Sequence, residues 1–245
     1  MQIQDLQHKI QNLSTTEQLF FLAETFKDKI AFSTSFGQED QIITDFIFKN
    51  NISIKVFTLD TGRLFAETYK VWNKTLETYN KPIVTYYPNN KEAEKMLTEK
   101  GPFSFYESIE NRKECCDIRK VNPLTHALAG IDLWITGLRA EQSEARAELP
   151  FFTYDDKFKV IKFNPLKDWT IQQVTEYIDK NNIPQNSLHE NGFISIGCQP
   201  CTRAIAKGED IRAGRWWWED KSKKECGLHV TQQTNPTIQF GKLKD

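Results

Sequence analysis

The chain has 245 residues, of which 39% are hydrophobic and 27% are charged. This balance supports a folded core and excludes disorder as the default state. The chain carries 32 lysines and arginines against 33 aspartates and glutamates, a net charge of −1. The composition therefore favours neither nucleic acid nor an anionic membrane as a partner, and an anionic ligand must be held by a local cluster of cations.

No stretch approaches the ~18 consecutive apolar residues that a membrane helix needs. The first seven residues lack both the basic and the apolar segment of a secretory signal. We therefore expect a cytoplasmic protein with no membrane segment. In that compartment five cysteines are expected to be metal ligands or catalysts rather than disulfides. Assembly into a homo-oligomer is left open.

The hydrophobic pattern predicts helices that alternate with strands. The first helix is predicted over 2–26, and Ser14 to Glu17 fit a capping box. Further along the chain, strands are predicted at 29–34, 52–58, 82–87, 131–136 and 159–163, and helices at 38–50, 62–79 and 171–181. This alternation predicts an α/β fold, a parallel twisted sheet flanked by helices on both faces.

Ligands of such sheets bind beyond the carboxyl ends of the strands. That rule predicts a site built from residues 33–37, 59–62 and 137–139. The segment from Ser33 to Asp40 joins a strand to a helix and has the hydroxyls, the glycine and the helix N-terminus of a phosphate cradle. It is not a Walker A loop, and an ordinary turn capped by serine is the alternative.

The character of the chain changes after about residue 195. We predict a nucleotide-binding α/β domain with the metal site over 1–205, and a mobile C-terminal tail over 206–245. Three consecutive tryptophans at 216–218 either close over an adenine or pin the tail to the core, and we favour pinning.

Four of the cysteines form two pairs, Cys115 with Cys116 and Cys198 with Cys201. Four thiolates suit a tetrahedral zinc ion or an iron–sulfur cluster, and the second pair alone is also typical of thioredoxin-like redox sites. Adjacent cysteines bind a single zinc ion awkwardly, whereas a cubane presents a separate iron to each thiolate. The pattern favours the cluster and leaves zinc, or no metal, as alternatives.

Cys226 remains, and it is either a stray thiol or a nucleophile. Nearby Lys223, Lys224 and His229 favour a thiolate, while Glu225 opposes it.

Several cations are candidates for holding an anion. Arg212 and Arg215 lie three residues apart, and guanidinium groups match phosphate and sulfate oxygens. Arg139 and Arg146 could serve the same anion. Lys120 follows Cys116 by four residues and shares its face if this segment is helical, which would link the cysteines to a bound sulfate. A solvated surface position is the alternative for each of them.

Together these segments resemble the adenylylsulfate and phosphoadenylylsulfate reductase family. The resemblance runs from about residue 31 to residue 229 and is carried by segments 33–41, 59–65, 115–121, 136–139 with 142–143, 197–202, 208–218 and 225–229. It implies a fold like that of the adenine nucleotide α-hydrolases, with a modified phosphate loop. Ala66 and Ala140 depart from residues that are common in the family, proline and arginine, and neither change removes a reacting group.

The resemblance also implies roles for individual residues. Cys115, Cys116, Cys198 and Cys201 would bind a 4Fe-4S cluster. Cys226 would be the nucleophile, with Lys120, Arg212, Arg215 and His229 meeting the phosphosulfate. The nucleotide site would be lined by Ser33, Ser35, Phe36, Gly37, Leu59 and Gly137.

The implied reaction reduces adenosine 5′-phosphosulfate to sulfite and AMP through a cysteine S-sulfonate, with thioredoxin or glutaredoxin as reductant. The two cysteine pairs favour this substrate, and 3′-phosphoadenylylsulfate, or use of both nucleotides, is the alternative. An ATP-dependent sulfurtransferase would need a Ser-Gly-Gly type loop where Ser33 to Gly37 stand. A metal sensor would leave Cys226 and the C-terminal arginines without a role.

Overall fold

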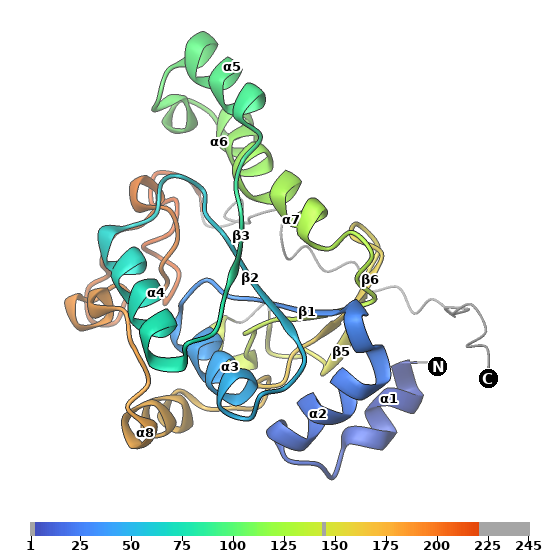
Figure 1. Ribbon diagram of the computed structural model, residues 1–245. Coiled ribbons are helices and arrows are strands. Elements are labelled where there is room, and N and C mark those ends of the chain that lie inside the picture. The colour runs from blue at the N-terminus through green and yellow to red at the C-terminus, as the bar shows by residue number, and fades with distance from the viewer. Residues whose placement is uncertain (1–2, 144–145, 221–245) are drawn as a thin grey trace.

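A six-stranded sheet forms the centre of the protein in a computed structural model, which describes residues 3–143 and 146–220 (Figure 1). The strand order is β3-β2-β1-β4-β6-β5. The strands are β1 (Ile30–Ser33), β2 (Lys55–Leu59), β3 (Val84–Tyr86), β4 (Leu133–Ile135), β5 (Phe152–Asp155) and β6 (Val160–Phe163). All neighbours pair in parallel except β5 and β6, which are antiparallel. The predicted α/β fold is confirmed, with one antiparallel edge strand added.

Helices cover both faces of the sheet. They are α1 (Ile3–Ile10), α2 (Thr15–Phe26), α3 (Gln38–Lys49), α4 (Ala66–Tyr79), α5 (Asn90–Lys100), α6 (Ile109–Cys116), α7 (Asn122–Ala127) and α8 (Ile171–Asn181). Successive strand residues point to opposite faces, so Phe32 joins the core shared with α2, α3 and α8, whereas Ala31 packs with Leu124 and Ala127 of α7.

The N-terminal segment, predicted as one helix, is two. The predicted capping box is present and starts α2: the backbone N–H of Ser14 donates to Glu17 Oε2 at 2.8 Å, and the N–H of Glu17 donates to Ser14 Oγ at 3.4 Å. The amide of Gln18 donates to the carbonyls of Ile10 and Leu13, at 3.2 and 3.0 Å. A side chain therefore satisfies the carbonyls where α1 ends.

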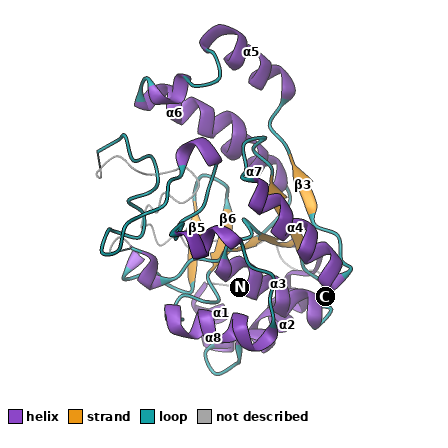
Figure 2. Ribbon diagram, turned by 90° about the vertical axis from the view of Figure 1, so that its left-hand side faces the viewer, coloured by secondary structure: helices purple, strands orange, loops and turns teal. Residues whose placement is uncertain are grey.

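The region between β3 and β4 holds three helices that the hydrophobic pattern did not predict. Helices α5 and α6 project from the sheet as an arm, as both views show (Figures 1 and 2). The chain then passes through a π-helical turn, Asp117–Val121, into α7. The segment with Lys120 is thus helical but wider than an α-helix, because its hydrogen bonds span five residues.

Residues 214–216 are buried against the domain, whereas 206–211 are exposed. Thr202 and Arg215 form an antiparallel bridge. Trp216 is buried, which agrees with pinning for this tryptophan, whereas Trp217 is 40% exposed. The boundary at residue 205 stays a prediction, and the proposed tail runs past the described residues. Cys226 and His229 lie outside the described residues. Within 3–143 and 146–220, no helix is long and apolar enough to cross a membrane.

Candidate functional site

A cleft opens at the carboxyl ends of β1, β2 and β4, where the fold rule predicted it. It gathers, from distant parts of the sequence, the ten residues predicted to line the substrate site, whereas His229, also predicted to meet the phosphosulfate, lies outside the described residues. These residues are Ser33, Ser35, Phe36, Gly37, Leu59, Gly137, Arg139, Arg146, Arg212 and Arg215, and Lys120 lies on the same wall. Trp134 and His189 are among the other lining residues, which the sequence analysis did not select.

The loop between β1 and α3 adopts a conformation that its buried side chains maintain. Phe36 has a φ of 61°, in the left-handed region that a bulky residue adopts only at a cost. Its ring is buried and stacks on Trp72, with 5.4 Å between ring centroids. Its backbone N–H donates to Thr34 Oγ1 at 3.1 Å. Helix α3 begins after Gly37, so its N-terminal N–H groups lie beside the loop, as an anion cradle requires.

Asp40, a residue of α3, is hydrogen-bonded to this loop at Ser35. Its Oδ2 accepts hydrogen bonds from both the backbone N–H and the hydroxyl of Ser35, each at 2.6 Å. Burial raises the pKa of Asp40 to about 6, and the hydrogen bonds from Ser35 oppose that rise. A Cβ on Gly137 would lie 2.1 Å from Asp40 Oδ1. Glycine is therefore required at the end of β4, because the carboxylate occupies the place of a side chain.

Arg139 and Arg146 lie at one edge of the cleft. The guanidinium of Arg139 is buried, and it donates to Glu39 at 2.8 Å, to Glu141 at 3.1 Å and to the carbonyl of Trp169 at 2.9 Å. Arg139 thus joins α3, η4 (Ala140–Gln142) and the start of α8. Direct contact of either arginine with an anion stays a prediction.

Arg212 and Arg215 reach the cleft from the segment that follows the second cysteine pair. The side chain of Arg215 lies over the ring of Trp216, with 4.8 Å from Cζ to the ring centroid. Its Nη1 donates to the carbonyl of Ile196 at 3.5 Å, a long hydrogen bond. A Cβ on Gly197 would lie 2.3 Å from Arg215 Nη2, so the absence of a side chain there makes room for the guanidinium.

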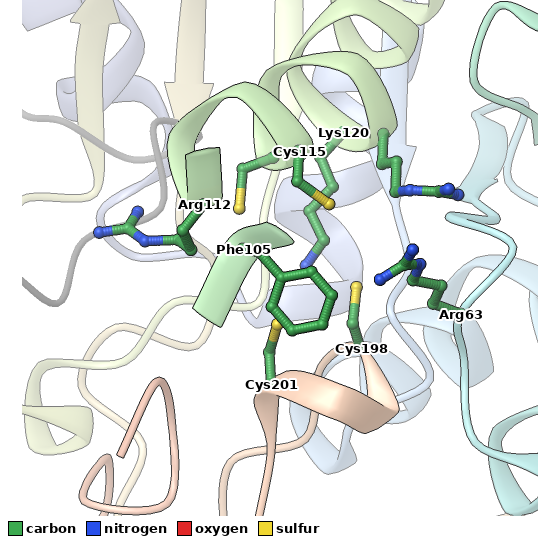
Figure 3. A pocket seen from close by; sticks show the side chains of 9 residues that line it. Arg63, Phe105, Arg112, Cys115, Lys120, Cys198 and Cys201 are labelled. Carbon is green, nitrogen blue, oxygen red and sulfur yellow. The ribbon is translucent and has the colours of Figure 1, made fainter. Parts of the chain in front are cut away.

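A second cavity adjoins the cleft, and all four paired cysteines line it (Figure 3). Cys115 and Cys116 end α6, whereas Cys198 precedes the 3-10 turn η7 (Gln199–Cys201) and Cys201 ends it. Figure 3 shows Cys115 facing Cys198 and Cys201 from the opposite side of the cavity. Lys120 lines both this cavity and the cleft, so the two spaces share a wall.

The cysteine cavity is rich in cations that the sequence analysis did not select. Arg63, Arg112 and Arg119 line it together with Lys120. The Nε of Arg119 and the Nε1 of nearby Trp216 are buried donors with no hydrogen-bond partner in the part of the chain that the structure describes. Buried cations and unsatisfied donors favour an anionic or acceptor-rich occupant. Arg112, Arg119 and Lys120 flank the first cysteine pair in the sequence, whereas Arg63 comes from the segment after β2.

Burial raises the pKa of two of the thiols, those of Cys115 and Cys201. That of Cys201 rises to about 12 through burial and the nearby Cys198, against the effects of Lys120 and Arg215. The pKa of Cys115 is raised by burial and opposed by Arg63. Such thiols stay protonated at neutral pH unless a metal displaces the proton, so they suit ligands better than nucleophiles. Within the described residues, no three His, Cys, Asp or Glu side chains are grouped to hold one metal ion.

The mostly parallel sheet, with helices on both faces and a cleft at its carboxyl edge, places the chain in the adenine nucleotide α-hydrolase-like class of α/β folds. Solved structures of this class are similar to the chain. Phosphoadenylyl-sulfate reductase from Candida auris, in a phosphate complex, has a TM-score of 0.70 and 28% identity, covering 83% of this chain and 96% of that one. Yeast FAD synthetase in complex with FAD has a TM-score of 0.53 and 14% identity over 82% and 68% of the two chains, which shows the fold alone.

The chain belongs to the phosphoadenosine phosphosulfate reductase domain family, whose profile matches residues 29–204. Adenosine 5′-phosphosulfate reductase of Neisseria meningitidis serogroup A is 51% identical over 199 residues, 81% of this chain and 82% of the relative. The enzyme of the same name from Rhizobium meliloti is 46% identical over 230 residues, 94% and 86% of the two chains. The expected class of enzyme, a reductase, is thereby confirmed.

Proposed function

We propose that the protein reduces adenosine 5′-phosphosulfate to sulfite and AMP in sulfate assimilation. Relatives that are 46–51% identical over most of the chain are named adenosine 5′-phosphosulfate reductase. The observation that carries the proposal is the shared wall: Lys120 lines both the serine- and arginine-lined cleft and the cavity of four cysteines. A sulfonucleotide bound in the cleft would have its anionic end close to that wall.

The reaction would proceed through a covalent intermediate on Cys226. Its thiolate attacks the sulfur of the sulfate group, an S–S bond forms, and the bond from sulfur to the phosphate oxygen breaks. AMP leaves with the electron pair of that bond. A thiolate of a thioredoxin or glutaredoxin then attacks Cys226 Sγ, and sulfite leaves with the electrons of the S–S bond. The partner's second thiol completes a disulfide and returns Cys226 as thiolate.

The cleft would supply the charge that this step needs. Arg212, Arg215 and Lys120 would stabilise negative charge on the phosphosulfate, together with the N-terminus of α3. Arg139 and Arg146 would order the edge of the cleft and face the same anion. The nucleoside would be bound by Ser33, Ser35, Phe36, Gly37, Leu59 and Gly137, which line the cleft. His229 would contact the phosphosulfate group beside Cys226.

Cys115, Cys116, Cys198 and Cys201 would hold a 4Fe-4S cluster. The donor set fits, because four thiols face one cavity and four cations beside them compensate thiolate charge. When bound, the cluster would supply electrostatic and structural support, since the two electrons of the reaction come from thiols. Lys120, on the wall between the cavities, would carry that influence to the substrate.

A sulfite assay on anaerobically purified protein tests the proposal. Adenosine 5′-phosphosulfate and its 3′-phosphorylated form are each supplied with thioredoxin, and sulfite and AMP are measured. We expect sulfite from adenosine 5′-phosphosulfate at the higher kcat/KM. The reverse preference would assign the chain to the activity named for the Candida auris structure, and no sulfite from either nucleotide would refute the function.

A further inference from the structure

The hydroxyl groups of Ser33 and Ser35 have opposite hydrogen-bonding environments, although both residues line the cleft. Ser33 Oγ accepts a hydrogen bond from the indole Nε1 of Trp134 at 2.8 Å. Ser35 Oγ donates to Asp40 Oδ2 at 2.6 Å. Both partners have fixed polarity, because an indole N–H only donates and an ionised carboxylate only accepts.

The two partners are held rigidly. Trp134 is 2% exposed on β4, and its ring lies edge-on to Phe158, with 5.9 Å between centroids, and beneath the ammonium of Lys162 at 5.1 Å. Asp40 is buried on α3, and its second hydrogen bond, from the backbone N–H of Ser35, fixes the carboxylate. Neither partner can rotate away without losing packing.

The polarity of each partner determines what its serine offers to a ligand. Because Ser33 Oγ receives the indole proton, its own proton stays available, and it finds no acceptor in the described part of the chain. Because the proton of Ser35 is committed to Asp40, its oxygen presents lone pairs. Ser33 is thus set as a donor to the cleft and Ser35 as an acceptor.

We propose that Trp134 and Asp40 are positioning residues that fix opposite hydrogen-bond polarities on Ser33 and Ser35, so that the loop reads a nucleotide by one acceptor atom and one donor group. An acceptor atom, such as a ring nitrogen or a phosphate oxygen, would meet Ser33. A donor group, such as an amine or a ribose hydroxyl, would meet Ser35. This inference rests on the proposed nucleotide binding. Trp134 and Asp40 would act through the two serines and would not contact the phosphosulfate group.

Double-mutant cycles test the proposal, with AMP affinity of the iron-loaded protein measured by calorimetry. Trp134→Phe removes the indole N–H and keeps an aromatic ring, and we expect AMP affinity to fall about 3- to 10-fold, the effect of one hydrogen bond. In a Ser33→Ala background the same substitution should have no further effect. An equal loss in both backgrounds would overturn the role of Trp134.

Asp40→Ala tests the second serine in the same way. It removes the acceptor of the Ser35 proton, so Ser35 Oγ is no longer fixed as an acceptor, and we expect a loss of about 10-fold that vanishes in a Ser35→Ala background. Asp45→Ala is the matched control, because Asp45 is also buried on α3 and accepts two hydrogen bonds, from Tyr79 and Tyr177. We expect it to lower stability and leave AMP affinity unchanged. An equal loss of affinity in this control would show that the effect of Asp40 is structural.

Trp169→Phe is the control for Trp134→Phe, because the side chain of Trp169 packs on Phe46 and Tyr177 and does not line the cleft. We expect it to leave AMP affinity unchanged.

If Trp134→Phe does not fold, the indole proton of Trp134 is observed directly by nuclear magnetic resonance. The Trp134 signal should move upfield in Ser33→Ala, and an unmoved signal would overturn the proposal. Sulfite production from adenosine 5′-phosphosulfate is measured separately. If the double-mutant cycles show the expected coupling in AMP affinity but no sulfite forms, only the proposed function is refuted. If sulfite forms but the cycles show no coupling, only this inference is refuted.

Discussion

Two ion pairs, each of a cationic side chain with a glutamate, differ sharply in burial, and this contrast gives a quantitative prediction. Arg112 and Glu219 are 1% and 4% exposed and join through two hydrogen bonds, at 2.9 and 2.7 Å. The guanidinium also lies over Trp216, with 5.0 Å from Cζ to the ring centroid. Lys100 and Glu114 form a pair at 2.6 Å that is 37% and 39% exposed. Coulomb's law alone would rank the two pairs as similar.

Glu219→Ala should lower the free energy of unfolding by about 3–5 kcal/mol, because it leaves a buried guanidinium without its carboxylate. Glu114→Ala should cost about 0–1 kcal/mol, because water screens the lysine that remains. The assay is anaerobic urea unfolding followed by circular dichroism, with iron content determined in parallel.

A double replacement separates charge burial from packing. Arg112→Leu combined with Glu219→Leu removes both charges and should be more stable than Glu219→Ala, since no uncompensated ion remains. Equal losses for Glu219→Ala and Glu114→Ala, or a double variant less stable than the single one, would refute the reasoning from burial.

Three further predictions concern the cleft and the cysteine cavity. Burial raises the pKa of Asp40 in the folded protein to about 6, from an ordinary value of 3.8. The folded state therefore binds a proton more tightly than the unfolded state, and its stability falls as the pH rises through 6. The unfolding free energy of wild type relative to Asp40→Asn should therefore rise by about 1 kcal/mol from pH 7.5 to pH 5, and a constant difference would contradict the buried carboxylate. Gly197→Ala should displace the guanidinium of Arg215, raising the KM for the sulfonucleotide with a loss of stability below about 1 kcal/mol; an unchanged KM would place Arg215 outside the binding site. Cys198→Ala should remove iron and visible absorbance from the purified protein, and full iron content would exclude Cys198 as a ligand.

Much of the sheet could be predicted from the sequence, because buried parallel strands are short apolar runs and their order along the chain is regular. Helix α8 matches its predicted range, 171–181, where Thr170 forms a capping box with Gln173. Strand β5 was missed because its burial alternates only partly and its pairing with β6 is tertiary. The split between α1 and α2 depends on hydrogen bonds from Gln18, which periodicity does not reveal.

The residues of the cleft could be named from the sequence, but not their partners. Arg139 was selected as an anion ligand from its place after β4, and the structure pairs it with Glu39, one hundred positions away. Among the cations around the cysteines, Arg63 was missed for the same reason, because it follows β2 and lies far from both cysteine pairs in the sequence. Arg112 lies three residues before Cys115 on α6, a helix that the hydrophobic pattern did not predict. Pairings between distant segments leave no local pattern in the sequence.

The central claim is that Cys226 carries the sulfonate group. Anaerobic protein is incubated with adenosine 5′-phosphosulfate in the absence of reductant, and its intact mass and tryptic peptides are measured. We expect one added SO3 group on the peptide that contains Cys226, its loss as sulfite when thioredoxin is added, and no adduct on Cys226→Ser. An adduct on another residue, or on Cys226→Ser, would contradict the account.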